Sequence, residues 1–365
     1  MNNVNVINGL IKSKFYLLNL EKVIKNININ EYYDIEQYDD LKKYQNDFFN
    51  NISCRFYDLK DYKVSNTIKK EAYYKSMLGN SSRIRPLLLF LGNLCSKQTV
   101  DKKILLNCGL SIEMIHKMSL ILDDYFDNDL KRKGQATFHT IYDERIMLET
   151  VKMLLNLSNN IFFNSIKKYD TKIQEELVKL YKQIIFDMGE GFLLDLDRKD
   201  KYISIDDTNR INNLQSSTII KNSLLIGYCL SNNNIHNYDY SLLSYIGVNM
   251  GRIFQSFNDI ENFVNEEEQL KDKGSLYTDL KENRKNVVLA RVPKYLFYNQ
   301  YTNEEIIKYI KENNLPQQII EELLSNIEDV QNKIAKLSSS IGKDTIMMVT
   351  NDVSKKTLKK LKIKS

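Results

Sequence analysis

The sequence predicts an all-α fold of about a dozen helices packed as a bundle. Apolar residues recur at helical spacing along most of the chain, and alternating strand-like runs bounded by turn residues are missing. With 365 residues, 42% of them hydrophobic, the chain can bury a large core. Three Pro, 12 Gly and no evident linker favour one main domain.

Helical spacing is clearest in stretches that are each long enough for at least three turns. These stretches are residues 84–95, 104–122, 145–163, 174–196, 242–264 and 321–341. The less regular, tyrosine-rich residues 1–60 are expected to form an N-terminal helical extension that packs on a main domain of residues 61–365. The terminal SKKTLKKLKIKS is a basic amphipathic tail. We expect a solvated helix end there, with a flap over an anionic site or a membrane-surface contact as alternatives.

Composition excludes several classes of function. The 52 basic and 47 acidic residues give a net charge of only +5. This near balance does not indicate a nucleic-acid-binding protein. Four Cys without CxxC spacing and three His indicate neither a disulfide framework nor a zinc site, so buried, reduced thiols are expected. No apolar run approaches about 18 residues, and the first residues lack a clean apolar core and a cleavage site. We therefore expect no transmembrane segment and a cytoplasmic location.

The stretch SLILDDYFDNDLKRKG, residues 119–134, places acids directly after a dense apolar run. On a helix, Asp123 and Asp127 share a face, and ionised acids so close repel one another unless a cation bridges them. A cluster of oxygen ligands without Cys or His suits Mg²⁺, which is often coordinated by protein carboxylates and by phosphate oxygens of a substrate at the same time. The cations that follow would face the same anion: Lys131, Arg132 and Lys133. The alternative is a helix end with a solvated charged loop.

A second stretch, GRIFQSFNDIENFVNEEE, repeats this arrangement far downstream. Asn258, Asn262 and Glu266 fall at i, i+4 and i+8 of one predicted helix face, with Asp259 beside them. Two such helix ends facing each other would hold a set of Mg²⁺ ions, with a diphosphate between them.

These stretches belong to a longer series of motifs. SSRIRP resembles a GKxxRP element, EMIHKMSLILDDYFDNDLKRKGQATFH a helix and loop with DDxxD and RRG, and GEGFLLDL a GQxxDL element. GRIFQSFNDIEN stands for FQxxDDxxD, and KGSLYTDLKENRKNVV for a closing pattern of glycine, lysine and DL. In this order, over roughly Ser81 to Ala290, they resemble the trans-isoprenyl diphosphate synthases, the polyprenyl synthetase family.

The resemblance implies an isoprenoid-synthase-type bundle of mostly antiparallel helices around a deep apolar cavity. It also implies three Mg²⁺ per site, an allylic prenyl diphosphate and isopentenyl diphosphate as substrates, and a homodimer. The catalytic residues it implies are Asp123, Asp124, Asp127 and Arg132. The substrate-binding residues are Arg85, His116, Arg132, Lys133, Gln255 and Lys273, although His116 could equally be a satisfied core histidine. The metal ligands are Asp123, Asp127, Asn258, Asp259, Asn262 and Glu266.

The sequence also departs from the family pattern. Ser82 stands where the family has the lysine of GKxxRP, Lys133 replaces the second arginine of RRG, and Phe192 replaces the glutamine of GQxxDL. In the second acidic motif, two of three aspartates are Asn258 and Asn262. The first metal motif is therefore intact, whereas the acceptor site and the second metal motif are eroded.

The leading prediction is an Mg²⁺-dependent prenyltransferase that uses isopentenyl diphosphate as acceptor. NDIENFVNE also has the spacing of the NDxxSxxxE triad of class I terpene synthases, but SKKTLKKLKIKS holds no Arg-Tyr pair of the kind those enzymes carry downstream. A terpene synthase, a noncatalytic partner subunit and prenyl transfer to a peptide or small acceptor are the alternatives.

Overall fold

The computed structural model describes residues 84–96, 100–197, 202–232, 235–264, 266–298, 301–340, 342–347 and 349–351. Within these ranges the chain forms twelve α-helices, α4 to α15, and a single two-stranded hairpin. The all-α prediction is confirmed. The predicted N-terminal extension, Ser82 and the basic tail lie outside the described residues.

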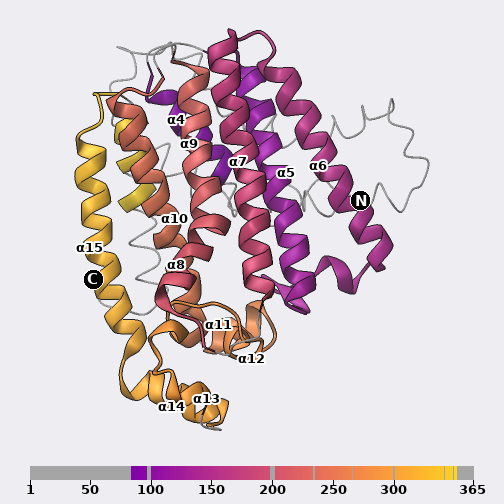
Figure 1. The fold of residues 1–365 in the computed structure, drawn as a ribbon, viewed down its shortest axis with the longest axis vertical. Helices are drawn as coiled ribbons and strands as arrows, with labels where there is room; N and C mark the ends of the chain where they lie inside the picture. The colour runs from indigo at the N-terminus through magenta and orange to yellow at the C-terminus, as the bar shows by residue number, and fades with distance from the viewer. Residues whose placement is uncertain are drawn as a thin grey trace.

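Six long helices run roughly along one axis, and α11 and α12 lie at one end of the bundle (Figure 1). The first half of the chain holds α4 Ile84–Leu94, α5 Lys102–Phe126, β1 Lys131–Arg132, β2 Gln135–Ala136, α6 Glu144–Ile166 and α7 Thr171–Leu196. Next come α8 Ile205–Asn212, a π-helix Asn213–Ser217, α9 Thr218–Leu230 and α10 Tyr238–Val264. The last helices are α11 Glu266–Asp272, α12 Thr278–Lys281, α13 Tyr295–Tyr298, α14 Asn303–Glu312 and α15 Leu315–Ala335.

The centre of the core is α9, whose residues are all buried except Lys221. It packs against α4, α7 and α10, and most of its residues are apolar, as expected for an enclosed helix. Two glycines let α9 and α4 approach closely. A Cβ on Gly227 would lie 1.7 Å from the Leu89 carbonyl oxygen, and one on Gly92 would lie 2.0 Å from the Leu224 oxygen.

Short polar side chains start several of the helices. Asp143 and Asp170 each accept a hydrogen bond from the backbone N–H three residues on, at the first turns of α6 and α7. Thr302 and Glu305 form a reciprocal capping box at the start of α14. Helices α6, α7 and α14 therefore begin where local sequence satisfies the free N–H groups of a helix.

Lys103–Phe126 is long and apolar enough to cross a membrane, but 78% of its most apolar window is buried inside the fold. This burial is what a core helix of the bundle requires. The cysteines in the described ranges, Cys95, Cys108 and Cys229, are buried and free, as expected. Burial raises the pKa of the Cys95 thiol to about 12, which keeps it protonated and unreactive.

Candidate active site

A cavity of about 580 Å³ opens where α5, the hairpin, α10 and α12 come together. Its apolar lining includes Leu120, Ile121, Met188, Phe192, Ile211 and Ile219. It also contains almost every predicted site residue: Arg85, His116, Asp123, Asp124, Asp127, Arg132, Lys133, Gln255, Asn258, Asp259, Asn262 and Lys273. The cavity lining thus combines charged and apolar side chains.

The end of α5 gathers the first acidic motif. Asp127 caps the helix and donates its backbone N–H to the Asp123 carbonyl at 2.9 Å. Asn128 then adopts a positive φ of 52°, and the Asp129 N–H returns to the Asp124 carbonyl at 3.0 Å. This sharp reversal keeps the acids that follow the helix beside those on its last turn.

A short hairpin places Arg132 over these acids. Lys133 and Gly134 form its two-residue turn with φ values of 52° and 73°, the positive pair that a type I′ turn requires. Arg132 donates from Nη2 to Asp123 at 2.7 Å and from Nε to Asp124 at 2.6 Å. Burial raises the pKa of Asp124 to about 6, while Arg132 opposes that shift. The structure therefore joins the predicted arginine to the predicted acids.

The second acidic motif occupies the last turns of α10. The two carboxylate oxygens of Asp259 accept from Gln255 Nε2 at 2.8 Å and from the Val287 N–H at 2.9 Å. Gln255 in turn accepts from the Ser216 hydroxyl at 2.7 Å, so it positions Asp259. Burial and nearby Asp279 raise the pKa of Asp259 to about 7. Asn258 is exposed and lines the cavity.

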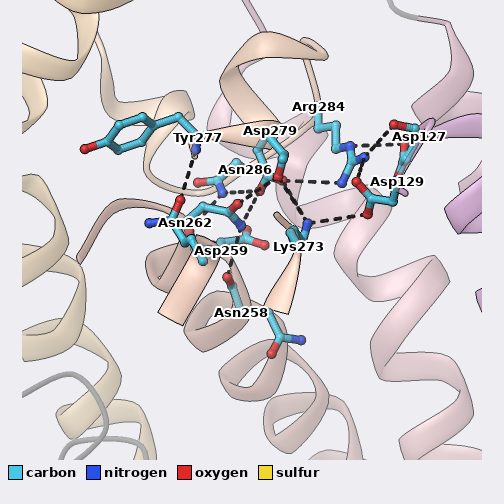
Figure 2. Close-up of polar contacts among 12 residues, drawn as sticks. Asp127, Asp129, Asn258, Asp259, Asn262, Lys273, Tyr277, Asp279, Arg284 and Asn286 are labelled. Carbon is cyan, nitrogen blue, oxygen red and sulfur yellow. Dashed lines mark hydrogen bonds and ion pairs between the residues drawn. The ribbon is translucent and has the colours of Figure 1, made fainter. Parts of the chain in front are cut away.

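Asp279 is the centre of a buried network that the sequence did not single out (Figure 2). Asn262 Nδ2 and Asn286 Nδ2 donate to the same Asp279 oxygen at 2.9 and 2.7 Å. Asn262 Oδ1 accepts from the Thr278 hydroxyl at 3.1 Å. Both ends of the Asn262 amide are therefore used inside the protein.

Two cations complete this network. Arg284 contacts Asp127, Asp129 and Asp279, and Lys273 Nζ lies 3.7 Å from Asp129 and 3.9 Å from Asp279. Burial acts to lower the pKa of Arg284, but the three carboxylates outweigh it and hold the pKa above its ordinary value. Asp279 and Arg284 lie in the stretch KGSLYTDLKENRKNVV, in which the sequence predicts a binding role for Lys273 alone. Asp279 and Arg284 are five residues apart across a turn, so no helical or strand periodicity in the sequence indicates that their side chains meet.

A separate pair lies elsewhere in the cavity lining. Arg85 Nη1 is 2.9 Å from His116 Nε2, and burial lowers the pKa of Arg85 to about 10, with Glu113 opposing the shift. Lys117, the next residue on α5, is 6% exposed and lines the same cavity. Lys117 lies within an apolar run, so no local pattern indicates that it lines a binding site.

The structure does not bring Glu266 to the site. The sequence predicts Glu266 on the same helix face as Asn258 and Asn262, but its carboxylate contacts Tyr277 and Lys311, which do not line the cavity. Its half-exposed carboxylate accepts from Lys311 Nζ at 2.8 Å and from the Tyr277 hydroxyl. Glu266 is not among the residues that line the cavity.

The side chains of the two motifs differ in how well they fit a metal ion. Mg²⁺ takes one or two carboxylates and fills its remaining positions with water and phosphate oxygens. Asp123 fits this role, because its side chain is 39% exposed in the cavity wall and its contact with Arg132 uses one of its two oxygens, Oδ2. Asp259 and Asn262 do not fit, because their oxygens already accept hydrogen bonds. In the described part of the chain, no three His, Cys, Asp or Glu residues converge to hold an ion by themselves.

Comparison with known proteins agrees with this geometry. The family model for polyprenyl synthetase matches residues 67–327. A short chain isoprenyl diphosphate synthase from Methanocaldococcus jannaschii is 22% identical, covering 68% of this chain and 72% of the relative. A prenyl transferase from Cyanidium caldarium is 26% identical, covering 80% and 90% of the two chains.

Solved structures share the fold. Heptaprenyl diphosphate synthase from Staphylococcus aureus superposes with a TM-score of 0.70 at 20% identity, covering 85% of this chain and 98% of the other. Geranylgeranyl pyrophosphate synthase from Corynebacterium glutamicum gives a TM-score of 0.71 at 15% identity, covering 87% and 98%. The chain therefore belongs to the polyprenyl synthetase family of prenyltransferases.

Proposed function

We propose that this protein ionises an allylic prenyl diphosphate with the help of Mg²⁺ and transfers the prenyl group to isopentenyl diphosphate. The observation that carries the proposal is one cavity whose lining combines acids and cations with apolar side chains. Its Corynebacterium structural relative was crystallised with isoprenyl diphosphate and magnesium, which supports the same ligands here.

Breaking the allylic C–O bond requires stabilisation of the negative charge that develops on the leaving diphosphate. Mg²⁺ bound at Asp123 would supply part of that stabilisation as a Lewis acid. Arg132, Lys133 and Lys273 line the same cavity and can donate hydrogen bonds to diphosphate oxygens. These cations both orient the substrate and hold the diphosphate after it leaves.

The prenyl chain and the cation formed from it need a dry, nonpolar space. Leu120, Met188 and Phe192 offer such a lining and would exclude water that could quench the cation. Phe192 stands where the family has a glutamine, which makes this wall more apolar. The acceptor diphosphate would bind at Arg85 and His116, with Lys117 adding a buried positive charge beside them.

The test is a product assay with purified protein and Mg²⁺. Geranyl, farnesyl and geranylgeranyl diphosphate are each supplied with and without isopentenyl diphosphate, and both hydrocarbon and diphosphate products are measured. The proposal requires a longer diphosphate that forms only when isopentenyl diphosphate is present. Hydrocarbons or alcohols formed from the allylic substrate alone would contradict it and indicate a terpene synthase. Folded protein without any product would indicate a noncatalytic subunit or another acceptor.

A further inference from the structure

Arg284 lies between the end of the first acidic stretch and Asp279, which in turn accepts a hydrogen bond from Asn262 of the second stretch (Figure 2). Its Nε is 3.1 Å from an Asp127 oxygen, and its Nη2 is 3.0 Å from an Asp129 oxygen. On the other side, its Nη1 is 3.6 Å from an oxygen of Asp279. One guanidinium thus links carboxylates that are up to 157 residues away from it in the chain.

The wall on the Asp279 side is already saturated by protein groups. The amides of Asn262 and Asn286 donate to one Asp279 oxygen, and Lys273 lies near the other. Asp279, Asn262 and Asn286 are all less than 9% exposed. The amide oxygens, which are the atoms that could bind a metal ion, are also used: Asn262 Oδ1 accepts from the Thr278 hydroxyl and Asn286 Oδ1 from the Val288 N–H. This wall is therefore built around fixed protein cations and amides.

Charge explains why a cation is needed at this point. Asp127, Asp129 and Asp279 are buried, and ionised carboxylates brought together without a counter-ion would destabilise the fold. A buried arginine meets this need well, because its planar fork contacts several carboxylates and stays charged. The Arg284 side chain is only 9% exposed, so it belongs to the wall and not to the solvent.

We propose that Arg284, with Lys273 beside it, is a built-in counter-ion that replaces metal between the two acidic stretches. Metal binding is then confined to the Asp123 side, and the site holds fewer than the three Mg²⁺ ions that the family resemblance implies. This inference rests on the proposed Mg²⁺ site at Asp123. It predicts that removing Arg284 turns the vacated position into a place where divalent metal binds.

The experiment compares wild type with Arg284→Met by thermal unfolding in EDTA and in Mg²⁺, and counts bound Mn²⁺ by electron paramagnetic resonance with inorganic diphosphate present. In EDTA the variant should unfold at a lower temperature than wild type, because three carboxylates lose their main counter-ion. Metal at about 100 times its Kd should then raise the variant's Tm by about 5 °C more than that of wild type. The variant should also bind at least one more Mn²⁺ than wild type.

Arg291→Met is the matched control, because Arg291 pairs with Glu322 away from the cavity lining. That variant should lose stability without gaining any dependence on metal. Arg284→Lys keeps a charge, but its single ammonium group cannot contact Asp127, Asp129 and Asp279 together as the guanidinium does. We therefore expect metal to raise its Tm less than it raises the Tm of Arg284→Met. If Arg284→Met does not fold in EDTA but folds in Mg²⁺, the same conclusion follows.

Two results would overturn the inference. The first is that wild type binds three Mn²⁺ ions. The second is that the Tm values of Arg284→Met and Arg284→Lys depend on metal no more than the Tm of wild type does. Asp123→Asn separates this inference from the proposed function. If wild type binds Mn²⁺ and Asp123→Asn does not, the Mg²⁺ site stands whatever Arg284 does. If wild type and Asp123→Asn both fail to bind Mn²⁺ while Arg284→Met binds it, the counter-ion role of Arg284 is supported and the proposed metal site at Asp123 is wrong.

Discussion

The guanidinium of Arg85 lies 2.9 Å from Nε2 of His116. Arginine can only donate hydrogen bonds, so Nε2 of His116 must accept and the ring is neutral, with its proton on Nδ1. The histidine therefore orients Arg85, which can then present its remaining donors to an anion in the cavity. This contact is compatible with two roles for His116, a structural residue of the core and a residue of the acceptor-binding site. A kinetic experiment distinguishes the two roles.

His116→Phe should raise KM for isopentenyl diphosphate about tenfold, since the loss of one hydrogen bond to a charged group costs about 1.5–3 kcal/mol. KM for the allylic substrate should stay within about twofold of the wild-type value, because His116 contacts Arg85 and not the acids around Asp123. His116→Gln is the matched control, since its amide oxygen can accept from Arg85 and should preserve most of the affinity. Equal increases in both KM values would contradict an acceptor role.

Asp123→Asn should lower kcat on the order of 10³-fold, because the substitution removes the exposed carboxylate that fits Mg²⁺. Initial rates over a range of Mg²⁺ concentrations provide the measurement. Asp170→Asn is a suitable control, because Asp170 caps α7 outside the cavity lining and Asn caps helices equally well. Wild-type turnover by Asp123→Asn would show that the metal is held elsewhere.

Arg132→Ala should reduce kcat/KM at least tenfold more than Lys131→Ala. Arg132 contacts both Asp123 and Asp124 and can clamp a diphosphate with two parallel donors, whereas Lys131 is an exposed strand residue. Steady-state kinetics on the allylic diphosphate give the comparison directly. Equal losses in the two variants would mean that general positive charge, and not the arginine clamp, matters here.

Gly227→Ala should destabilise the fold by roughly 3 kcal/mol, because the new Cβ would lie 1.7 Å from the Leu89 carbonyl and α4 would have to move. Gly109→Ala in α5 is the control. Its Cβ would meet no atom closer than 3.4 Å, so the higher helix propensity of Ala should stabilise by up to about 1 kcal/mol. Urea unfolding of both variants tests the close contact of α4 and α9.

The predicted homodimer has a candidate surface on α7. Phe186 and Leu193 are seven residues apart on one helix face, and each is 72% exposed. Phe186→Asp should shift the protein from dimer to monomer in light scattering, because a buried charge opposes association. Leu324→Asp, which alters an exposed apolar residue on α15, should leave the dimer intact. A wild-type monomer would refute the prediction outright.

Local sequence alone determined the helices and the first acidic motif. Apolar spacing and caps such as Asp143 and Asp170 act over a few residues, so the bundle could be predicted without knowledge of the packing. The order of the motifs also sufficed to predict the family, which the family match confirms. Asp123, Asp124 and Arg132 lie within ten residues of one another, and the prediction that they act together needed only a turn between them.

Only the tertiary structure decided how the second acidic motif is used. Helical spacing assigned Glu266 to the face of Asn262, but in the folded protein Glu266 pairs with Lys311 and does not line the cavity. Arg284 meets Asp129 across 155 residues, and no local pattern encodes a contact of that range. Buried acids take whichever cation the packing brings to them, because desolvation makes an unpaired charge costly. The sequence shows which charges exist, and the fold determines which of them meet.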